Sequence, residues 1–210
     1  NGTSWTNVHA GEHMEIEINP TNPDIIYTVK LNGDNTEFYK SLDNGLTWTI
    51  KTNGWPLPGA GDEQKRVEIG ISADDANIVY VWGGGEVGGI GGFYGFYKST
   101  DAGESFTFEC CGTSAGGTPT VSNPNMLGWA ELGDDDGGQY YYDLAFAASP
   151  TDADRVFGSG INVWRSLNSG VNWELNAHWV TWVGATTHDR YSHADVHDIK
   201  FFQNGGSVDM

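Results

Sequence analysis

The sequence predicts an all-β fold made of repeated four-stranded antiparallel sheets. One eight-residue pattern, Ser-x-Asp-x-Gly-x-(Thr/Ser)-aromatic, occurs at 41–48 and 99–106 and, with changes, at 166–173. The same order of short alternating segments precedes each copy. The 210 residues include 30 glycines and nine each of Trp, Tyr and Phe, which favours many short strands joined by tight turns. A pattern that recurs in this way indicates a repeat architecture.

Turn chemistry explains the residues of the repeated pattern, which we call the repeated turn. Its Asp can accept hydrogen bonds from nearby backbone N–H groups, and its Gly supplies the positive φ of a tight connection. We therefore expect a structural role, and no catalysis, at its twelve defining positions. They are Ser41, Asp43, Gly45, Trp48, Ser99, Asp101, Gly103, Phe106, Ser166, Asn168, Gly170 and Trp173.

Period-two alternation predicts the strands of each repeat in a fixed order. First strands are expected at 14–18, 67–71 and 143–147, second strands at 25–27, 78–80 and 155–157, and third strands at 38–41, 96–99 and 163–166. A fourth strand follows the repeated turn, as at 48–50 and 106–108. Four antiparallel strands with adjacent connections describe a blade of a β-propeller, and the repeating order disfavours a two-sheet sandwich.

The whole chain, residues 1–210, is expected to form part of one propeller domain, with about three complete blades and two partial ones. The blade cores are expected at 14–50, 67–108 and 143–175, with the end of a blade at 1–13 and the start of another at 197–210. Asn1–Trp5 matches the tail of the repeated turn, so we expect the remaining blades of a longer chain. Three stretches are expected as insertions: the Gly-rich 83–95, then 110–139 and 178–196.

The net charge of −18, with only ten Lys and Arg, excludes the cationic face that nucleic acid requires. The same acidity favours the binding of cations. No apolar run approaches the length of a membrane-spanning helix, so no membrane insertion is expected. The two cysteines, Cys110 and Cys111, are adjacent, and disulfide geometry disfavours a bond between neighbours. We expect two free thiols, with a strained redox pair or a bridge to another segment as alternatives.

The pattern Ser-x-Asp-x-Gly-x-Thr-Trp after Tyr39-Lys40 resembles the Asp-box, or BNR, repeat. That repeat occurs in sialidases, sortilin-type receptors, xyloglucan-hydrolysing glycosidases and photosystem assembly factors. The resemblance implies a β-propeller whose Asp-box turns lie on the outer side, with the functional face at the starts of the innermost strands. A sialidase would need an arginine triad on that face, and Arg155 belongs instead to a second strand.

Three further stretches, 141–150, 160–166 and 193–198, look more narrowly like secreted Bacteroidetes proteins that carry a type IX secretion sorting domain. That resemblance implies a bacterial protein at the cell surface or outside the cell.

Titratable residues concentrate just before the predicted first strands, where five of the six histidines fall. If those strands are innermost, these residues line the mouth of the central channel, as a binding or catalytic face would. The predicted binding rim is His13, Glu15, Arg66, Tyr141, Tyr142, His193, His197 and Asp198. Glycoside hydrolysis would need two facing carboxylates about 5 to 10 Å apart. The candidates for it include Glu68, Asp143 and Asp195.

Two acidic tracts offer ligands for metals. His193, Asp195 and His197 share one side of an extended strand and could bind a transition metal, although we favour a packing role. Asp134, Asp135 and Asp136 could coordinate calcium, the one cofactor that the sequence suggests, but the charge pattern favours a solvated loop.

These observations rank three hypotheses of function. First comes a secreted or cell-surface binding module that recognises a glycan or a protein through the inner-strand rim. A glycoside hydrolase with a pair of rim carboxylates is the second. A structural propeller within a large surface adhesin is the third. The first is preferred because the repeated turns are structural and no single pair of carboxylates stands out.

Overall fold

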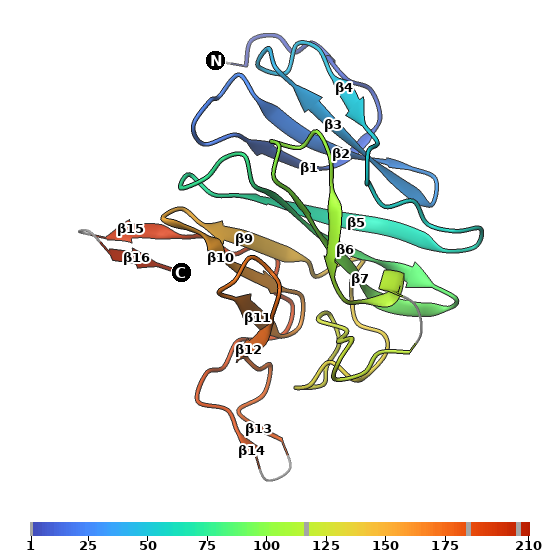
Figure 1. The fold of residues 1–210 in the computed structure, drawn as a ribbon, viewed down its shortest axis with the longest axis vertical. Coiled ribbons are helices and arrows are strands. Elements are labelled where there is room, and N and C mark those ends of the chain that lie inside the picture. The colour runs from blue at the N-terminus through green and yellow to red at the C-terminus, as the bar shows by residue number, and fades with distance from the viewer. Residues whose placement is uncertain (1, 116–117, 184–185, 205–206) are drawn as a thin grey trace.

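Three four-stranded antiparallel sheets stack side by side in the computed structural model, which describes residues 2–115, 118–183, 186–204 and 207–210 (Figure 1). In each sheet the strands lie in chain order. The all-β fold with propeller-type blades is therefore confirmed. The first sheet contains β1 (Glu12–Ile18), β2 (Ile26–Asn32), β3 (Asn35–Ser41) and β4 (Thr49–Lys51). The second contains β5 (Glu63–Ile71), β6 (Val79–Val87), β7 (Ile90–Ser99) and β8 (Thr107–Cys110). The third contains β9 (Ala145–Ser149), β10 (Asp152–Ser159), β11 (Val163–Ser166) and β12 (Glu174–Ala177).

The connections add a short 3₁₀ turn, η1 (Thr113–Ala115), and two hairpins, β13 (Trp182–Val183) with β14 (Thr186–Thr187) and β15 (Phe202–Asn204) with β16 (Ser207–Asp209). Of the two expected partial repeats, Asn1 and residues 205–206 lie outside the described residues. The strand expected from residue 197 begins later, at Phe202. No helix among the described residues has the length and apolar character needed to cross a membrane.

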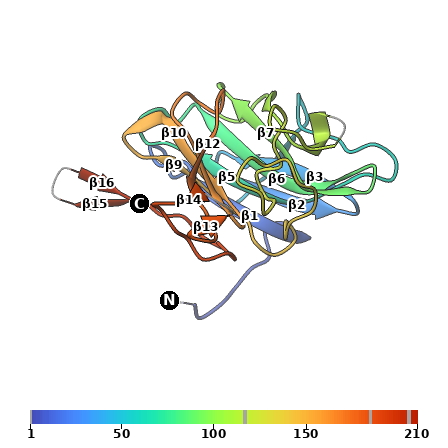
Figure 2. The same ribbon diagram turned by 90° about the horizontal axis from the view of Figure 1, so that it is seen from below.

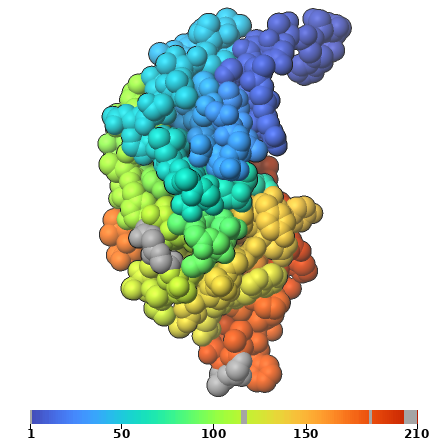
Figure 3. Space-filling model, turned by 90° about the vertical axis from the view of Figure 1, so that its right-hand side faces the viewer, coloured from blue at the N-terminus to red at the C-terminus, as the bar shows by residue number. Residues whose placement is uncertain are grey.

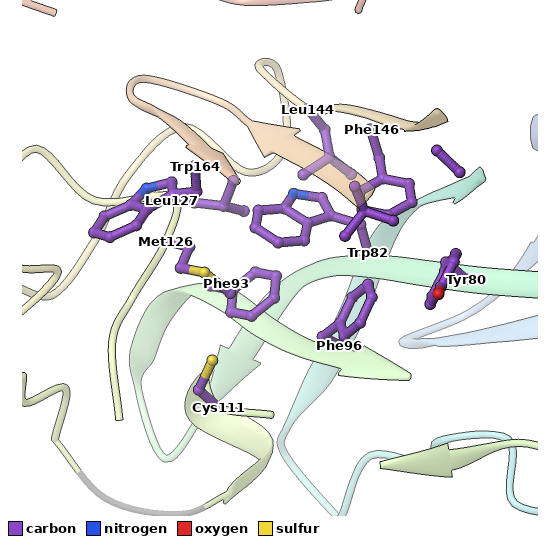
Figure 4. Packing of buried hydrophobic residues seen from close by; sticks show 12 residues of the cluster. Tyr80, Trp82, Phe93, Phe96, Cys111, Met126, Leu127, Leu144, Phe146 and Trp164 are labelled. Carbon is purple, nitrogen blue, oxygen red and sulfur yellow. The ribbon is translucent and has the colours of Figure 1, made fainter. Parts of the chain in front are cut away.

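The middle sheet is buried on both faces, which makes it the centre of the core. One face packs on the first sheet and the other on the third. Trp82 is fully buried between the second and third sheets, with its ring 4.2 Å from that of Phe93 and stacked 5.8 Å from that of Phe146 (Figure 4). Figure 3 shows one face of the molecule, with the N-terminal residues in blue at the top and later residues in yellow and orange below.

The three repeated turns have the same hydrogen bonds. In each, the Ser hydroxyl donates to the side-chain oxygen two residues later, at 2.8 Å for Ser41, 2.7 Å for Ser99 and 3.0 Å for Ser166. The same hydroxyl oxygen accepts the N–H of the turn's glycine, at 2.8 to 2.9 Å. All three glycines have a φ between +80° and +85°. Because these bonds satisfy buried backbone and hydroxyl groups, they support the structural role expected of the repeated turn.

The Gly-rich stretch 83–95 was expected to be an insertion, and this prediction is wrong. It belongs to β6 and β7, which pair from Val79↔Ser99 to Val87↔Ile90. The glycines leave room for close neighbours, because a Cβ at Gly85 would lie 2.1 Å from the Glu63 carbonyl oxygen and one at Gly84 would lie 2.7 Å from the Tyr140 Cβ. Close approach of neighbouring chain, and not loop flexibility, explains the run of glycine.

The expectation of two free thiols is also wrong, since Cys110 and Cys111 form a disulfide with each other. They lie at the end of β8, where the chain turns with a φ of +50° at Cys111. The buried Cys111 belongs to the core between the second and third sheets. The bond is thus part of the packing of the middle sheet.

The first strands of the three sheets, β1, β5 and β9, lie next to one another (Figures 1 and 2). The segment 193–202 returns to the third sheet, where the Val196 N–H donates to the Gly160 carbonyl at 2.9 Å. Val196, Ile199 and Phe201 pack on its core, and this brings the segment's polar side chains towards the first strands.

Candidate functional site

A pocket of about 470 Å³, which we call the inner pocket, lies between β1, β5, β9 and residues 197–202. Its lining combines apolar side chains with charged ones, most of which are acidic. The acidic residues are Glu15 and Glu17 from β1, Glu68 from β5, and Asp198. His197 and Lys200 are the basic residues of its lining, and the Lys200 ammonium donates to Asp198.

The strand pairing of β1 explains why it presents acids to the pocket. Glu15 pairs with Val29 and Glu17 with Tyr27, so both carboxylates share the face that packs towards the second sheet. Ile16 lies on the opposite face and is 63 % exposed. Sequence reasoning missed Glu17, although its position two residues after Glu15 was a signal that it shares that face.

Glu15 and Glu68 form a hydrogen-bonded pair of carboxyl groups between two neighbouring sheets. Burial first, and then the charge of Glu68, raise the pKa of Glu15 to about 9. Burial and the charge of Glu68 also raise the pKa of Glu17, to about 7. Burial raises the pKa of Glu68 as well, against the effect of Arg66, whose Nη2 lies 3.5 Å from Glu68 Oε1. A hydrogen bond between two carboxyl groups requires a proton, so the pair holds one at neutral pH.

Asp143 is a second perturbed carboxyl group at the same end of the sheets. Its side chain is fully buried, and its carboxyl group is hydrogen-bonded to that of Asp195. The nearest basic atom is His197 Nε2, 3.6 Å from Oδ1. Burial first, and then the neighbouring Asp195, raise the pKa of Asp143 to about 6, against the effects of His197 and Arg66.

Exposed aromatic rings flank these carboxyl groups. Tyr142 is 56 % exposed and meets His197 edge-on, with ring centroids 4.7 Å apart. Tyr141 is 69 % exposed and lies edge-on to Tyr140. Since His197 also lines the inner pocket, it links the tyrosines and Asp143 to it.

The structure therefore gathers most of the predicted rim at one place. The residues brought together are Glu15, Arg66, Glu68, Tyr142, Asp143, Asp195, His197 and Asp198.

His13 lies elsewhere, because a β-bulge between His13 and Glu15 breaks the alternation of β1. Its Nδ1 is 2.9 Å from Thr28 Oγ1, and it lines a separate pocket of about 380 Å³ with Trp48.

The two predicted metal tracts are in loops. His193 is exposed, and its Nδ1 contacts the Ala194 carbonyl. Asp135 accepts the Trp129 N–H at 2.7 Å, which ties its acidic tract to the preceding loop. Across the described residues, no group of three or more His, Cys, Asp or Glu side chains is arranged to hold a metal ion. Calcium binding at 134–136 stays a prediction.

The insertion 178–196 positions the segment that carries Asp195 and His197. His178 is 1 % exposed, and its backbone accepts from Ser192 N at 3.1 Å and donates to Arg190 O at 3.2 Å. His188 stacks on the His178 ring at 4.3 Å and lies 3.2 Å from Glu131. This buried histidine explains how a long insertion holds a defined shape beside the pocket.

No family model and no curated protein matches the chain. Among solved structures, YCF48 from Cyanidioschyzon merolae is 15 % identical, over 82 % of this chain and 40 % of that one, with a TM-score of 0.46. A structure of YCF48 bound to D1 peptide is 13 % identical, over 80 % and 41 %, with a TM-score of 0.47. The GH74 xyloglucanase from Xanthomonas campestris is 13 % identical, over 78 % and 23 %, with a TM-score of 0.49. The chain thus spans less than half of each of these structures, and the likeness concerns the fold alone.

Proposed function

We propose that this chain belongs to a secreted or cell-surface β-propeller that binds a carbohydrate at the inner pocket. The observation that carries the proposal is the convergence of carboxyl groups from two sheets and the His197 imidazole at one pocket, with the exposed Tyr142 ring against His197. Carboxyl and imidazole groups hydrogen-bond sugar hydroxyls, and a tyrosine ring covers the apolar face of a sugar ring. The extracellular location rests on the resemblance to Asp-box and type IX secretion proteins.

The size and charge of the pocket support a small polyhydroxylated ligand over a protein surface. Its volume of about 470 Å³ lies within the range of sites for small molecules, about 300–1,000 Å³. A stable protein interface would bury about 800 Å² on each partner. The net charge of −18 also disfavours an acidic ligand.

The test is a glycan array followed by isothermal titration calorimetry on wild-type protein and two variants. Tyr142→Ala removes the exposed ring and is expected to weaken binding about tenfold, because a stacked ring contributes about 1.4 kcal/mol or more. Glu109→Gln is the matched control, since Glu109 is exposed on β8, outside the lining of the inner pocket. Absence of any glycan ligand, or equal affinities for the two variants, would reject the proposal.

Glycoside hydrolysis is the second candidate, and the perturbed Asp143 favours it. A carboxyl group with a pKa of about 6 can remain protonated as a general acid while a neighbouring carboxylate is ionised. The test is an assay on a panel of plant and bacterial polysaccharides with Asp143→Asn and Glu68→Gln. This candidate would rank first if the wild type hydrolyses a polysaccharide and both variants do not, while circular dichroism shows that the variants are folded.

A further inference from the structure

The first sheet lies at one end of the stack, and its outer face is the one turned away from the second sheet (Figure 1). We propose that this outer face docks a further four-stranded sheet of the same repeat, from a part of the same polypeptide outside residues 1–210. The docked sheet brings a tyrosine from its second strand and a phenylalanine from its third strand to the repeated turn at 41–48. The inference goes beyond the proposed function, because it rests only on how the three sheets of this chain pack on one another.

The repeated turns of the second and third sheets each contact a second-strand tyrosine of the preceding sheet. The Tyr27 hydroxyl donates to the Ala102 carbonyl at 3.1 Å. At the next interface, the Tyr80 hydroxyl lies 2.8 Å from Ser169 Oγ. Ala102 and Ser169 occupy the same position of their turns, directly before the glycine. The contact is therefore repeated from one interface to the next.

The glycines of these two turns contact a third-strand phenylalanine of the preceding sheet. A Cβ at Gly103 would lie 3.1 Å from Phe38 Cε1, and one at Gly170 would lie 2.0 Å from Phe96 Cε1. The closing aromatic rings of the two turns meet the same phenylalanines, with ring centroids 4.9 and 5.1 Å apart. Each of the two turns thus receives one tyrosine and one phenylalanine from the sheet before it.

The turn at 41–48 has the same backbone shape, but among the described residues it contacts no aromatic ring of another sheet. The φ of Gly45 is +82°, and a Cβ there would meet only Trp48 and Ile26 of its own repeat, at 3.5 Å or more. The Trp48 ring stacks on His9, which precedes β1, at 5.7 Å. Its Nε1 is buried and has no hydrogen-bond partner among the described residues. This turn therefore has the form that receives two aromatic side chains and lacks them.

The separate pocket of about 380 Å³ beside Trp48 is lined by positions that are core positions in the second sheet. Ile16 and Thr28 line this pocket and pair with each other, as Ile69 pairs with Val81 in the second sheet. Ile69 and Val81 belong to the buried cluster between the first and second sheets. Ile69 is 2 % exposed, whereas Ile16 is 63 % exposed. An apolar position that is buried in one repeat and exposed in the next indicates an interface whose partner sheet is absent.

A second copy of residues 1–210 offers no free face for this docking among its described residues. The aromatic face of the first sheet is covered by the second sheet, and that of the second by the third. In the third sheet the corresponding side chains are Phe157 and Val163, which are covered by Val196, Ile199 and Phe201. The docking sheet therefore comes from outside these residues. Attachment to the same polypeptide favours it, because a covalent link raises its effective concentration.

The first experiment compares Gly45→Ala with Gly33→Ala in the protein at its full natural length. Both glycines have a positive φ, +82° and +67°, so the backbone penalties are similar. A phenylalanine docked on Gly45, as Phe96 is on Gly170, adds a steric clash to Gly45→Ala alone. Gly45→Ala is therefore expected to lower the melting temperature by about 4 °C or more beyond Gly33→Ala. Equal shifts would overturn the proposal.

Maleimide labelling of the same full-length protein measures whether the outer face is covered. Ile16→Cys is compared with Ile69→Cys, a buried reference, and with Val121→Cys, whose position is 61 % exposed. The two native cysteines are joined in a disulfide, and mass spectrometry identifies each labelled site. Ile16→Cys is expected to react as slowly as Ile69→Cys, about tenfold or more below Val121→Cys. A rate equal to that of Val121→Cys would show an open face and overturn the proposal.

A cross-link identifies what covers the face. Leu46 is 69 % exposed, and its counterpart in the second turn, Glu104, reaches Lys40 of the preceding sheet at 2.8 Å. Leu46→Cys is therefore labelled with a benzophenone maleimide and irradiated. The cross-linked peptide is expected to belong to the same polypeptide outside residues 1–210. A cross-link to residues 1–210 of a second copy, or to another protein, would overturn the proposal and assign the face to that partner.

Discussion

The carboxyl pair of Glu15 and Glu68 makes the stability of the fold depend on pH, and Glu15→Gln tests this. The wild-type pair needs a proton to form its hydrogen bond between the first and second sheets. A glutamine at position 15 can donate an N–H to the Glu68 carboxylate without any proton. The variant is therefore expected to keep the contact without retaining a proton that the unfolded chain releases.

The magnitude follows from the pKa. In the folded chain the pKa of Glu15 is about 9, against an ordinary value of 4.5. Below the ordinary value both states are protonated and the stabilisation is complete, and it is lost as pH rises towards 9. Between about pH 5.5 and 7.5 the unfolded chain has released a proton that the folded chain retains. Linkage gives a fall of up to about 1.4 kcal/mol per pH unit, or about 2.7 kcal/mol in all. Because Glu15 is only partly buried, we expect about 1–2 kcal/mol.

Urea unfolding at the two pH values measures the effect, because urea leaves electrostatic interactions unscreened. The free energies of unfolding of wild type and Glu15→Gln should be similar at about pH 5.5, and at about pH 7.5 the variant should be more stable by about 1–2 kcal/mol. Glu109→Gln should follow the wild-type pH dependence. Parallel pH profiles for wild type and Glu15→Gln, or a less stable variant at the higher pH, would refute the shared proton.

Two further predictions concern the repeated turns. Gly170→Ala should cost about 3 kcal/mol or more in urea unfolding, because its φ is +85° and a Cβ would lie 2.0 Å from Phe96 Cε1. Gly33→Ala should cost only about 1 kcal/mol, since its φ is also positive but nothing lies within 4 Å, and equal costs would contradict the packing. In Asp101, slight burial raises the pKa, but hydrogen bonds from two serines of its turn outweigh it and lower the pKa to about 2. Asp101→Asn should therefore lose about 1 kcal/mol at neutral pH, after allowance for exposure, and the loss should vanish as pH falls from about 4 to 2. A loss that does not change with pH would point to the shape of the turn instead.

The repeated turns could be predicted from the sequence because their chemistry is local. The Ser99 hydroxyl bonds Asp101 and Gly103, and Asp101 bonds the N–H of Ser105, so every partner lies within a few residues. The strand order was accessible for the same reason, since alternation and turn residues are local signals. The pre-strand segments also indicated the end of the sheets at which the acidic side chains meet.

What the sequence could not predict depends on contacts between distant residues. The run of glycines in β6 and β7 predicts a loop. Its strand structure is explained by the close approach of Tyr140 and the Glu63 backbone, which are distant in the sequence. The bulge that separates His13 from Glu15 is a property of pairing with β2. The burial of Asp143 beside Asp195 depends on the third sheet and its neighbours, so the pKa of Asp143 could not be anticipated from its position in the chain.

The stacking of the sheets has a consequence for how the chain folds. The first sheet packs on the second, and the second on the third. A sheet therefore keeps a hydrophobic face exposed until the next sheet has been synthesised. On the ribosome, Val29 and Phe38 emerge well before Val67 and Val81, against which their cluster packs. A nascent chain halted between the two sheets would present these side chains to solvent. During synthesis from the N-terminus, the exposed face of the first sheet can therefore aggregate or bind a chaperone. It becomes buried once β8 has been translated and the second sheet has formed.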